Sequence, residues 1–408
     1  MGLPLAAGLT SPAARTSIFY FALYMTGAVS NPYLAIWLSG QGIPPEQIGI
    51  VNALPFFVMI LFNQFVGRIA DRARDWRSTI IIGSTLAAVG PILLFFVHDY
   101  AGILVVWALI VVPFQAIAPV VDAASLRLAR RIGADFALIR VWGTIGFVTM
   151  TITAGLLLDW YGAMAFLPLI VAASLLRMVT SLQLPLFRAP VVVKTGGAVK
   201  ARRKSPLVAT RLRQVWRPWF LLPLIGVALL HGSHMMQMGF GALIWQQQGI
   251  PAWIIGPLWA VAPAGEIVVM LFFARLARRF SARHLILFAC LAAVVRWAGF
   301  AMEPPLWALA ALQLLNMATF GLSYLGIVNF IANWTSEDIA AEAQSFFTVI
   351  RQVVTVLALT GFGFLTAQWG AGAFYGAAAM GAAGAVLTFV SLMLMHPRHE
   401  RRQLPSQR

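Results

Sequence analysis

Long apolar stretches, separated by short polar or Gly/Pro-containing breaks, run along almost the whole of this 408-residue chain. A helix needs about 20 apolar residues to cross the core of a bilayer, and each stretch is roughly that long. The stretches are continuously apolar and do not alternate with a period of two, which favours helices over the strands of a membrane barrel. The pattern predicts an all-α polytopic membrane protein with twelve transmembrane helices. The predicted spans are 17–38, 46–66, 78–97, 102–126, 138–158, 162–184, 218–240, 252–274, 283–301, 305–333, 343–366 and 371–395.

The composition agrees with this pattern, because 60% of the residues are hydrophobic, only 10% are charged and the mean hydropathy is +0.83. Soluble domains carry about 25% charged residues, so an ordinary soluble enzyme, a disordered protein and a coiled coil are excluded. Cys290 is the one cysteine, which leaves no intrachain disulfide and no thiolate metal site. The first apolar run is too long for a signal peptide, and we expect a retained first helix.

Basic residues set the expected topology. Of 29 Lys and Arg residues, 25 fall in breaks that all lie on one side if both termini are cytoplasmic. The longest break divides the chain into a six-helix bundle at 1–184, a basic cytoplasmic linker at 185–217 and a second six-helix bundle with a cytoplasmic tail at 218–408. The charge of the linker is that of a loop beside anionic lipid headgroups, and a nucleic-acid partner is not expected.

An internal repeat supports two related halves. Residues 41–70 match 248–277 at 11 of 30 positions, and Gln41-Gly42-Ile43-Pro44 recurs as Gln248-Gly249-Ile250-Pro251. Parallel halves of this kind are typical of transporters, with a substrate site between them near the middle of the membrane.

The break after the second span reads Gly67-Arg68-Ile69-Ala70-Asp71-Arg72. It resembles the Gly-x-x-x-Asp-Arg loop of the major facilitator superfamily. The resemblance implies the fold of that superfamily, two pseudo-symmetric six-helix bundles, and a conformational latch formed by Gly67, Arg68, Asp71 and Arg72. A generic positive-inside loop is the alternative.

Further motifs resemble the branch that contains lactose permease and the phenylpropionate permeases. The run from Arg140 to Phe147 is similar to an Arg-x-aromatic-Gly-x-x-Gly-aromatic motif, and Asp122 stands where lactose permease has its substrate-binding carboxylate. Other matching segments are Gly265-Glu266, Val295-Arg296-Trp297, and His231-Gly232-Ser233-His234. Asn316 and Thr319 depart from the pattern, because lactose permease has the His and Glu of its proton step there. Either the proton carrier lies elsewhere or the coupling differs.

Six ionisable residues other than histidine fall inside the spans, and a charge in a bilayer is a functional candidate by default. They are Asp122, Arg140, Arg177, Glu266, Arg296 and Arg351. Asp122 could pair with Arg140, either as a structural pair or as one that opens for substrate, and Glu266 could pair with Arg296. Four arginines against two acids leave a formal charge of +2, which favours an anionic substrate. The balance becomes zero if Arg177 and Arg351 snorkel to the membrane surface, and for Arg177 snorkelling is the preferred interpretation.

Aromatic and polar residues at helical spacing complete the candidate site, although ordinary packing explains each of them equally well. His231 and His234 face the same way, but a metal site would need more ligands, and none is expected. The predicted substrate-binding residues are Arg140, Asp122, Arg296, Tyr24, Trp142, His234, Gln115 and Trp259, and the predicted proton-coupling residues are Glu266 and Asp122.

These features predict a monomeric transporter of the bacterial inner membrane that works by alternating access and has no cofactor besides the proton gradient. An external proton would neutralise a buried carboxylate and free an arginine for a small organic anion such as an aromatic carboxylate. Symport of a neutral sugar or nucleoside and export by the same fold are alternatives. A polytopic membrane enzyme or sensor is a distant one, since neither a catalytic constellation nor a soluble domain is evident.

Overall fold

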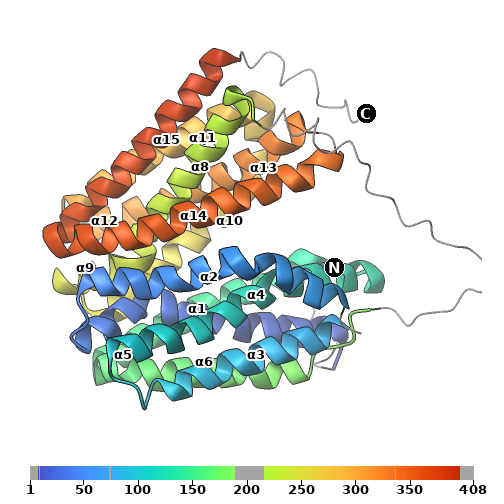
Figure 1. The fold of residues 1–408 in the computed structure, drawn as a ribbon, viewed down its shortest axis with the longest axis vertical. Coiled ribbons are helices and arrows are strands. Elements are labelled where there is room, and N and C mark those ends of the chain that lie inside the picture. The colour runs from blue at the N-terminus through green and yellow to red at the C-terminus, as the bar shows by residue number, and fades with distance from the viewer. Residues whose placement is uncertain (1–7, 9, 73–74, 189–215, 336, 396–408) are drawn as a thin grey trace, which may run out of the picture.

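The computed structural model describes residue 8 and residues 10–72, 75–188, 216–335 and 337–395. Side chains at 63–72, 264, 266–275, 277–278 and 337–342 are not described. Every regular element in the described ranges is helical, and element labels follow Figure 1.

The first half contains six long helices. They are α1 (Pro12–Gly40), α2 (Pro45–Arg72), α3 (Trp76–Leu93), α4 (Tyr100–Ile132), α5 (Phe136–Tyr161) and, after the short η2 (Ala163–Ala165), α6 (Phe166–Leu182). Short polar side chains fix where several of these begin: Asp75, Asp99 and Asp135 each accept a hydrogen bond from a backbone N–H in the first turn of α3, α4 and α5. Helix α4 runs six residues past its predicted end at 126, because Arg130 and Arg131 favour the C-terminal end of a helix dipole.

The second half repeats this arrangement with two interruptions. Its elements are α8 (Pro218–Met236), η4 (Gln237–Gly241), α9 (Ala242–Gln247), α10 (Ala252–Arg279), α11 (Ala282–Ala301), α12 (Leu306–Leu314), η5 (Met317–Leu322), α13 (Ser323–Trp334), α14 (Glu337–Trp369), η6 (Gly370–Ala373) and α15 (Phe374–Leu394). The segments η4 and η5 are π-helical turns; η5 lies inside the predicted span 305–333, and η4 overlaps the end of the predicted span 218–240. Such turns contain one extra residue and often occur at functional sites.

The two halves pack by the same scheme, which confirms the predicted pseudo-symmetric fold. Helix α1 packs against α5 and α6, and α3 packs against α4 and α6. Equivalently, α8 packs against α14 and α15, and α11 packs against α13 and α15. In Figure 1 the first half (blue to green) lies below the second (yellow to red), and the halves converge near α9. The main contacts between the halves are α2 with α14 and α5 with α10.

Glycines make the inter-half contacts close. A Cβ built on Gly49 of α2 would lie 2.6 Å from the Leu359 carbonyl oxygen of α14 and 3.1 Å from the Cα of Gly363. A Cβ on Gly256 of α10 would lie 2.6 Å from the Thr151 carbonyl oxygen of α5. Gly49 and Gly256 are equivalent positions of the internal repeat, so the molecule closes one end with two copies of the same contact.

By length and apolar composition, nine stretches within the described residues could cross a membrane. One of them, Ala343–Leu394, runs from within α14 to the end of α15, and the apolar stretch Ala252–Pro263 of α10 is shorter than the nine. Helix α1 is not among the nine, because it is rich in polar residues that are buried between α5, α6 and the second half. The predicted domain limits at 184, 185, 217 and 218 stay a prediction, since residues 189–215 lie outside the described ranges.

Candidate functional site

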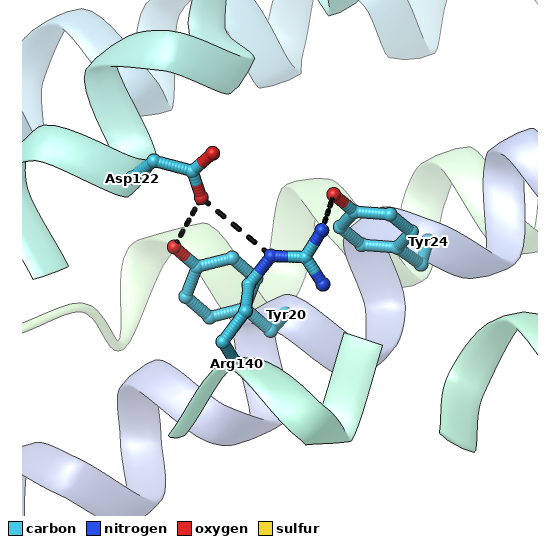
Figure 2. Close-up of polar contacts among 4 residues, drawn as sticks. All are labelled: Tyr20, Tyr24, Asp122 and Arg140. Carbon is cyan, nitrogen blue, oxygen red and sulfur yellow. Dashed lines mark hydrogen bonds and ion pairs between the residues drawn. The ribbon is translucent and has the colours of Figure 1, made fainter. Parts of the chain in front are cut away.

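Four side chains from three helices of the first half form one polar cluster, which Figure 2 shows. The Tyr20 hydroxyl of α1 donates to Oδ1 of Asp122 on α4 at 2.6 Å. The Nε of Arg140 on α5 lies 3.7 Å from the same Asp122 oxygen, and its Nη2 donates to the Tyr24 hydroxyl. The structure therefore brings together Asp122, Arg140 and Tyr24 as the sequence predicts, with Tyr20 as a fourth member.

The sequence of α5 explains how Arg140 reaches this place. Gly143 and Gly146 face α1, and a Cβ on Gly146 would lie 2.3 Å from the Phe21 carbonyl oxygen. Because no larger residue fits there, α5 lies directly against α1, and the Arg140 guanidinium carbon comes within 4.2 Å of the Tyr24 ring centroid. An arginine over the face of a tyrosine ring is stabilised by the quadrupole of the ring.

The Asp122–Arg140 pair is open to ligands. The Asp122 side chain is 51% exposed and the Arg140 side chain 31% exposed, whereas Tyr20 is fully buried. A separation of 3.7 Å is longer than a strong charge-assisted hydrogen bond of about 2.7–2.9 Å, so the pair is loose. Asp122 and Arg140 are positioned by the two tyrosines more firmly than by each other.

A second polar cluster surrounds Arg296 in the other half. Its guanidinium is fully buried and donates to the side-chain oxygens of Asn316 (2.7 Å), Thr319 (3.2 Å), Gln237 (2.7 Å) and Gln313 (2.7 Å). Its carbon also lies 4.4 Å from the Trp297 ring. Gln313 is held in turn by the Leu258 carbonyl oxygen, to which its Nε2 donates at 3.0 Å.

The Arg296 cluster extends to His234. Nδ1 of His234 lies 2.8 Å from the Leu230 carbonyl oxygen, which can only accept, so Nδ1 carries the proton. The other ring nitrogen, Nε2, lies 3.0 Å from the Thr319 hydroxyl oxygen. His234 is thus a buried, hydrogen-bonded residue, and it reaches the Arg296 cluster through Thr319.

The remaining predicted residues stand apart from these clusters. Trp259 is buried on α10 and Trp142 is half-buried on α5, and neither indole N–H has a hydrogen-bond partner in the described ranges. Gln115 is half-buried on α4, seven residues before Asp122. The side chains of Glu266 and of the latch residues Gly67, Arg68, Asp71 and Arg72 lie outside those described. The Glu266–Arg296 pair and the latch therefore stay predictions.

Two arginines differ in their surroundings. The preferred interpretation of Arg177 as a snorkelling residue is wrong, because its side chain is 0% exposed and its guanidinium carbon lies 5.2 Å from the Phe114 ring inside the first half. Its i, i+3 and i, i+4 neighbours Ser174, Ala173 and Ser181 are buried too, so this face of α6 points into the bundle. Arg351 is exposed on α14.

Gln237 and Gln313 are functional candidates that the sequence prediction missed. Each is an amide in an otherwise apolar stretch, and that polar interruption is the signal that could have found them. Their shared target, Arg296, is distant in sequence, so only the fold reveals the cluster.

Two six-helix halves related by an internal repeat, with charged clusters inside each half, define a secondary membrane transporter. The model of the family described as "MFS_1 like family" matches residues 13–388, and the chain belongs to this family of the major facilitator superfamily. It is a multi-pass membrane protein.

Similar proteins are transporters with different cargo. The chain is 27% identical to a probable 3-phenylpropionic acid transporter of Escherichia coli strain K12 over 368 residues, which cover 87% of this chain and 92% of the relative. It is 26% identical to a maltose permease of Geobacillus stearothermophilus over 89% of this chain and 91% of the relative. The crystal structure of the nucleoside transporter NupG superposes with a TM-score of 0.79 at 16% identity, covering 95% of this chain and 99% of that one.

Proposed function

We propose that this transporter takes up a small organic anion, such as an aromatic carboxylate, together with a proton. The observation that carries the proposal is the half-exposed pair of Asp122 and Arg140, held by Tyr20 and Tyr24. A guanidinium offers two parallel N–H groups that match the two oxygens of a carboxylate. The phenylpropionic acid named for one relative is an anion of this class.

In the proposed cycle, Asp122 and the substrate compete for Arg140. When a proton neutralises Asp122, the acid remains hydrogen-bonded to Tyr20 and its attraction for Arg140 falls. The substrate carboxylate then takes the guanidinium, while Tyr24 keeps that guanidinium in place. Loss of the proton restores the attraction of Asp122 and favours release. The anion and the proton are therefore transported together, because protonation of Asp122 frees Arg140 for the anion and a bound anion keeps Arg140 away from Asp122.

Arg296 has a different part in this proposal. Four side-chain acceptors hold its guanidinium, so an incoming carboxylate would have to displace several good hydrogen bonds. We therefore assign the anion to Arg140. Arg296 forms a polar wall of the site, and Thr319 connects Arg296 to His234. Glu266 remains the second candidate for the proton.

The orientation follows from the basic residues. With both termini cytoplasmic, the glycine contacts at Gly49 and Gly256 close the outer side, and the structure corresponds to an inward-facing state of a monomer in a bacterial inner membrane. The linker at 185–217 then joins the two bundles on the cytoplasmic side.

Transport of a neutral sugar is the second candidate, because one relative is named a maltose permease. Arg140 distinguishes the two candidates. Binding of an anion depends on Arg140, whereas a sugar needs only hydrogen-bonding groups, charged or neutral. Since the named relatives are transporters, transport is favoured over an enzymatic or sensory function.

The test is binding and transport with purified protein. We expect 3-phenylpropionate, and not maltose, to raise the temperature of unfolding, and its addition outside proteoliposomes to make the external medium alkaline. Arg140→Ala should weaken binding roughly tenfold to a hundredfold, the value of about 1.5–3 kcal/mol for a charged hydrogen bond. Arg130→Gln, an exposed arginine at the end of α4, serves as the control. Stabilisation by maltose alone, or anion transport without alkalinisation, would contradict the proposal.

A further inference from the structure

The interior of the first half contains a cation that the proposed transport site does not use. Arg177 of α6 is fully buried, and Nε, Nη1 and Nη2 of its guanidinium have no hydrogen-bond partner among the described side chains and backbone. The ring of Phe114, 5.2 Å from the guanidinium carbon, contacts it from α4. A ring can cover the face of a guanidinium, but the N–H groups lie in its plane and need acceptors.

Two further buried hydroxyls lie on α6 and on α3, which packs against α6. Ser174, one turn earlier on the same face of α6, is fully buried and its hydroxyl has no partner in the described part of the chain. Helix α3 packs against both α6 and α4, and its Ser84 is likewise fully buried with an unpartnered hydroxyl within the described ranges. Three buried polar residues on packed helices therefore present hydrogen-bond donors.

The one acid that the sequence places well inside the spans of this half, Asp122, is already engaged elsewhere. Asp122 is bound by Tyr20 and lies beside Arg140. No described acidic side chain forms an ion pair with Arg177. An unpaired buried charge is expensive, and contact with one aromatic ring offsets only part of that cost. A buried cation with a donor hydroxyl one turn away on the same helix face suits a small anion.

We propose that the first half binds a halide ion, chloride under ordinary conditions, between Arg177, Ser174 and Ser84. The site suits a single small ion, because the Arg177 side chain is 0% exposed and lies under Phe114, whereas a carboxylate substrate needs an exposed group such as Arg140. The bound halide neutralises Arg177, so the helix packing of this half does not enclose a bare charge. This assignment does not depend on the identity of the transported substrate.

The test measures thermal unfolding of the purified, detergent-solubilised full chain in sodium gluconate. Gluconate is replaced stepwise by chloride or bromide at constant ionic strength. We expect a saturable rise in the unfolding temperature by several degrees with either halide, because an ion that binds only the folded state stabilises it. Arg177→Met should abolish this dependence, whereas the control Arg130→Gln should retain it. An unfolding temperature of the natural chain that does not respond to halide, or an equal response in Arg177→Met, would overturn the proposal.

A milder variant and a direct observation keep the test decisive if Arg177→Met does not fold. Ser174→Ala removes one neutral hydrogen bond and should weaken the apparent halide affinity by about two- to tenfold. Crystals grown with bromide should show an anomalous peak within hydrogen-bonding distance of the Arg177 guanidinium. An unchanged affinity in Ser174→Ala, or an ordered water at that place without anomalous signal, would refute the site.

Discussion

Closure of the end at which α2 and α10 begin depends on the absence of two side chains. Gly256→Ala would place a Cβ 2.6 Å from the Thr151 carbonyl oxygen and 3.0 Å from the Ile152 Cα. Ordinary van der Waals contact begins at 3.4 Å, so α10 and α5 must separate by about 0.8 Å, the difference between 3.4 and 2.6. Both obstacles are backbone atoms, which cannot rotate away. Overpacking of this kind costs about 1–3 kcal/mol.

This cost applies to the state in which this end is closed and not to the state in which it is separated. We therefore expect Gly256→Ala to shift the balance between the two states by roughly tenfold to a hundredfold toward separation of this end. Gly49→Ala should act in the same direction, because its Cβ meets the Leu359 carbonyl oxygen at the same 2.6 Å. Gly361→Ala is a matched control, since a Cβ there meets nothing within 4 Å.

Spin labels at two exposed positions can report the separation. Met164, between α5 and α6, and Met302, after α11, are 82% and 72% exposed and belong to different halves. The natural Cys290 is buried and stays unlabelled. Pulsed electron–electron double resonance should give mainly one distance between the two labels when both glycines are unchanged. Gly256→Ala should add a longer distance. Distance distributions that coincide for Gly256→Ala, Gly49→Ala and Gly361→Ala would show that these contacts do not control closure.

Three further predictions concern the polar clusters and the packing around them. Tyr24→Phe removes a hydrogen bond from Arg140, and titration calorimetry should show about two- to tenfold weaker binding of 3-phenylpropionate, whereas equal affinity would place Tyr24 outside the site. Gln313→Leu leaves Arg296 with one acceptor fewer and should lower stability by about 1–3 kcal/mol in chemical unfolding, and an unchanged midpoint would contradict the Arg296 cluster. Gly146→Ala should destabilise by about 1–3 kcal/mol through its clash with the Phe21 carbonyl oxygen, and normal thermal stability would show that α1 and α5 yield easily.

The sequence predicts the helices well because bilayer thickness sets the length of each apolar run. It also predicts that Gly49 and Gly256 are equivalent, because the repeat at 41–70 and 248–277 carries both glycines in register. The hydrophobic pattern does not show which residues lie next to each other across the bundle. Asp122 and Arg140 can be predicted as candidates because a charge inside an apolar run is conspicuous.

The surroundings of Arg296 and Arg177 are harder to predict from the sequence. Gln237 and Gln313 are neutral amides, which interrupt an apolar run less conspicuously than a charge does, yet they hold Arg296. Arg177 lies within reach of the end of α6, so sequence distance favours snorkelling, but the buried face of that helix points into the bundle. Depth along a helix can be counted from sequence, whereas direction around the helix depends on which neighbours pack against it.

The π-turns η4 and η5 bear on how this protein tolerates changes in chain length. Gln237 begins η4, Asn316 directly precedes η5, and both hold Arg296. Helix α9, which follows η4, contacts α1 of the other half. Because a π-turn holds one extra residue, deleting one residue between 237 and 241 would leave a regular helix in which α9 keeps about the same direction. The same deletion in the regular part of α8 would rotate everything after it by about 100°, and the contact between α9 and α1 would be lost although every side chain of α9 was still present. The relation between the Arg296 cluster and the opposite half is therefore encoded in a residue count, and a single deletion should be tolerated better inside these two turns than in the regular helix before them.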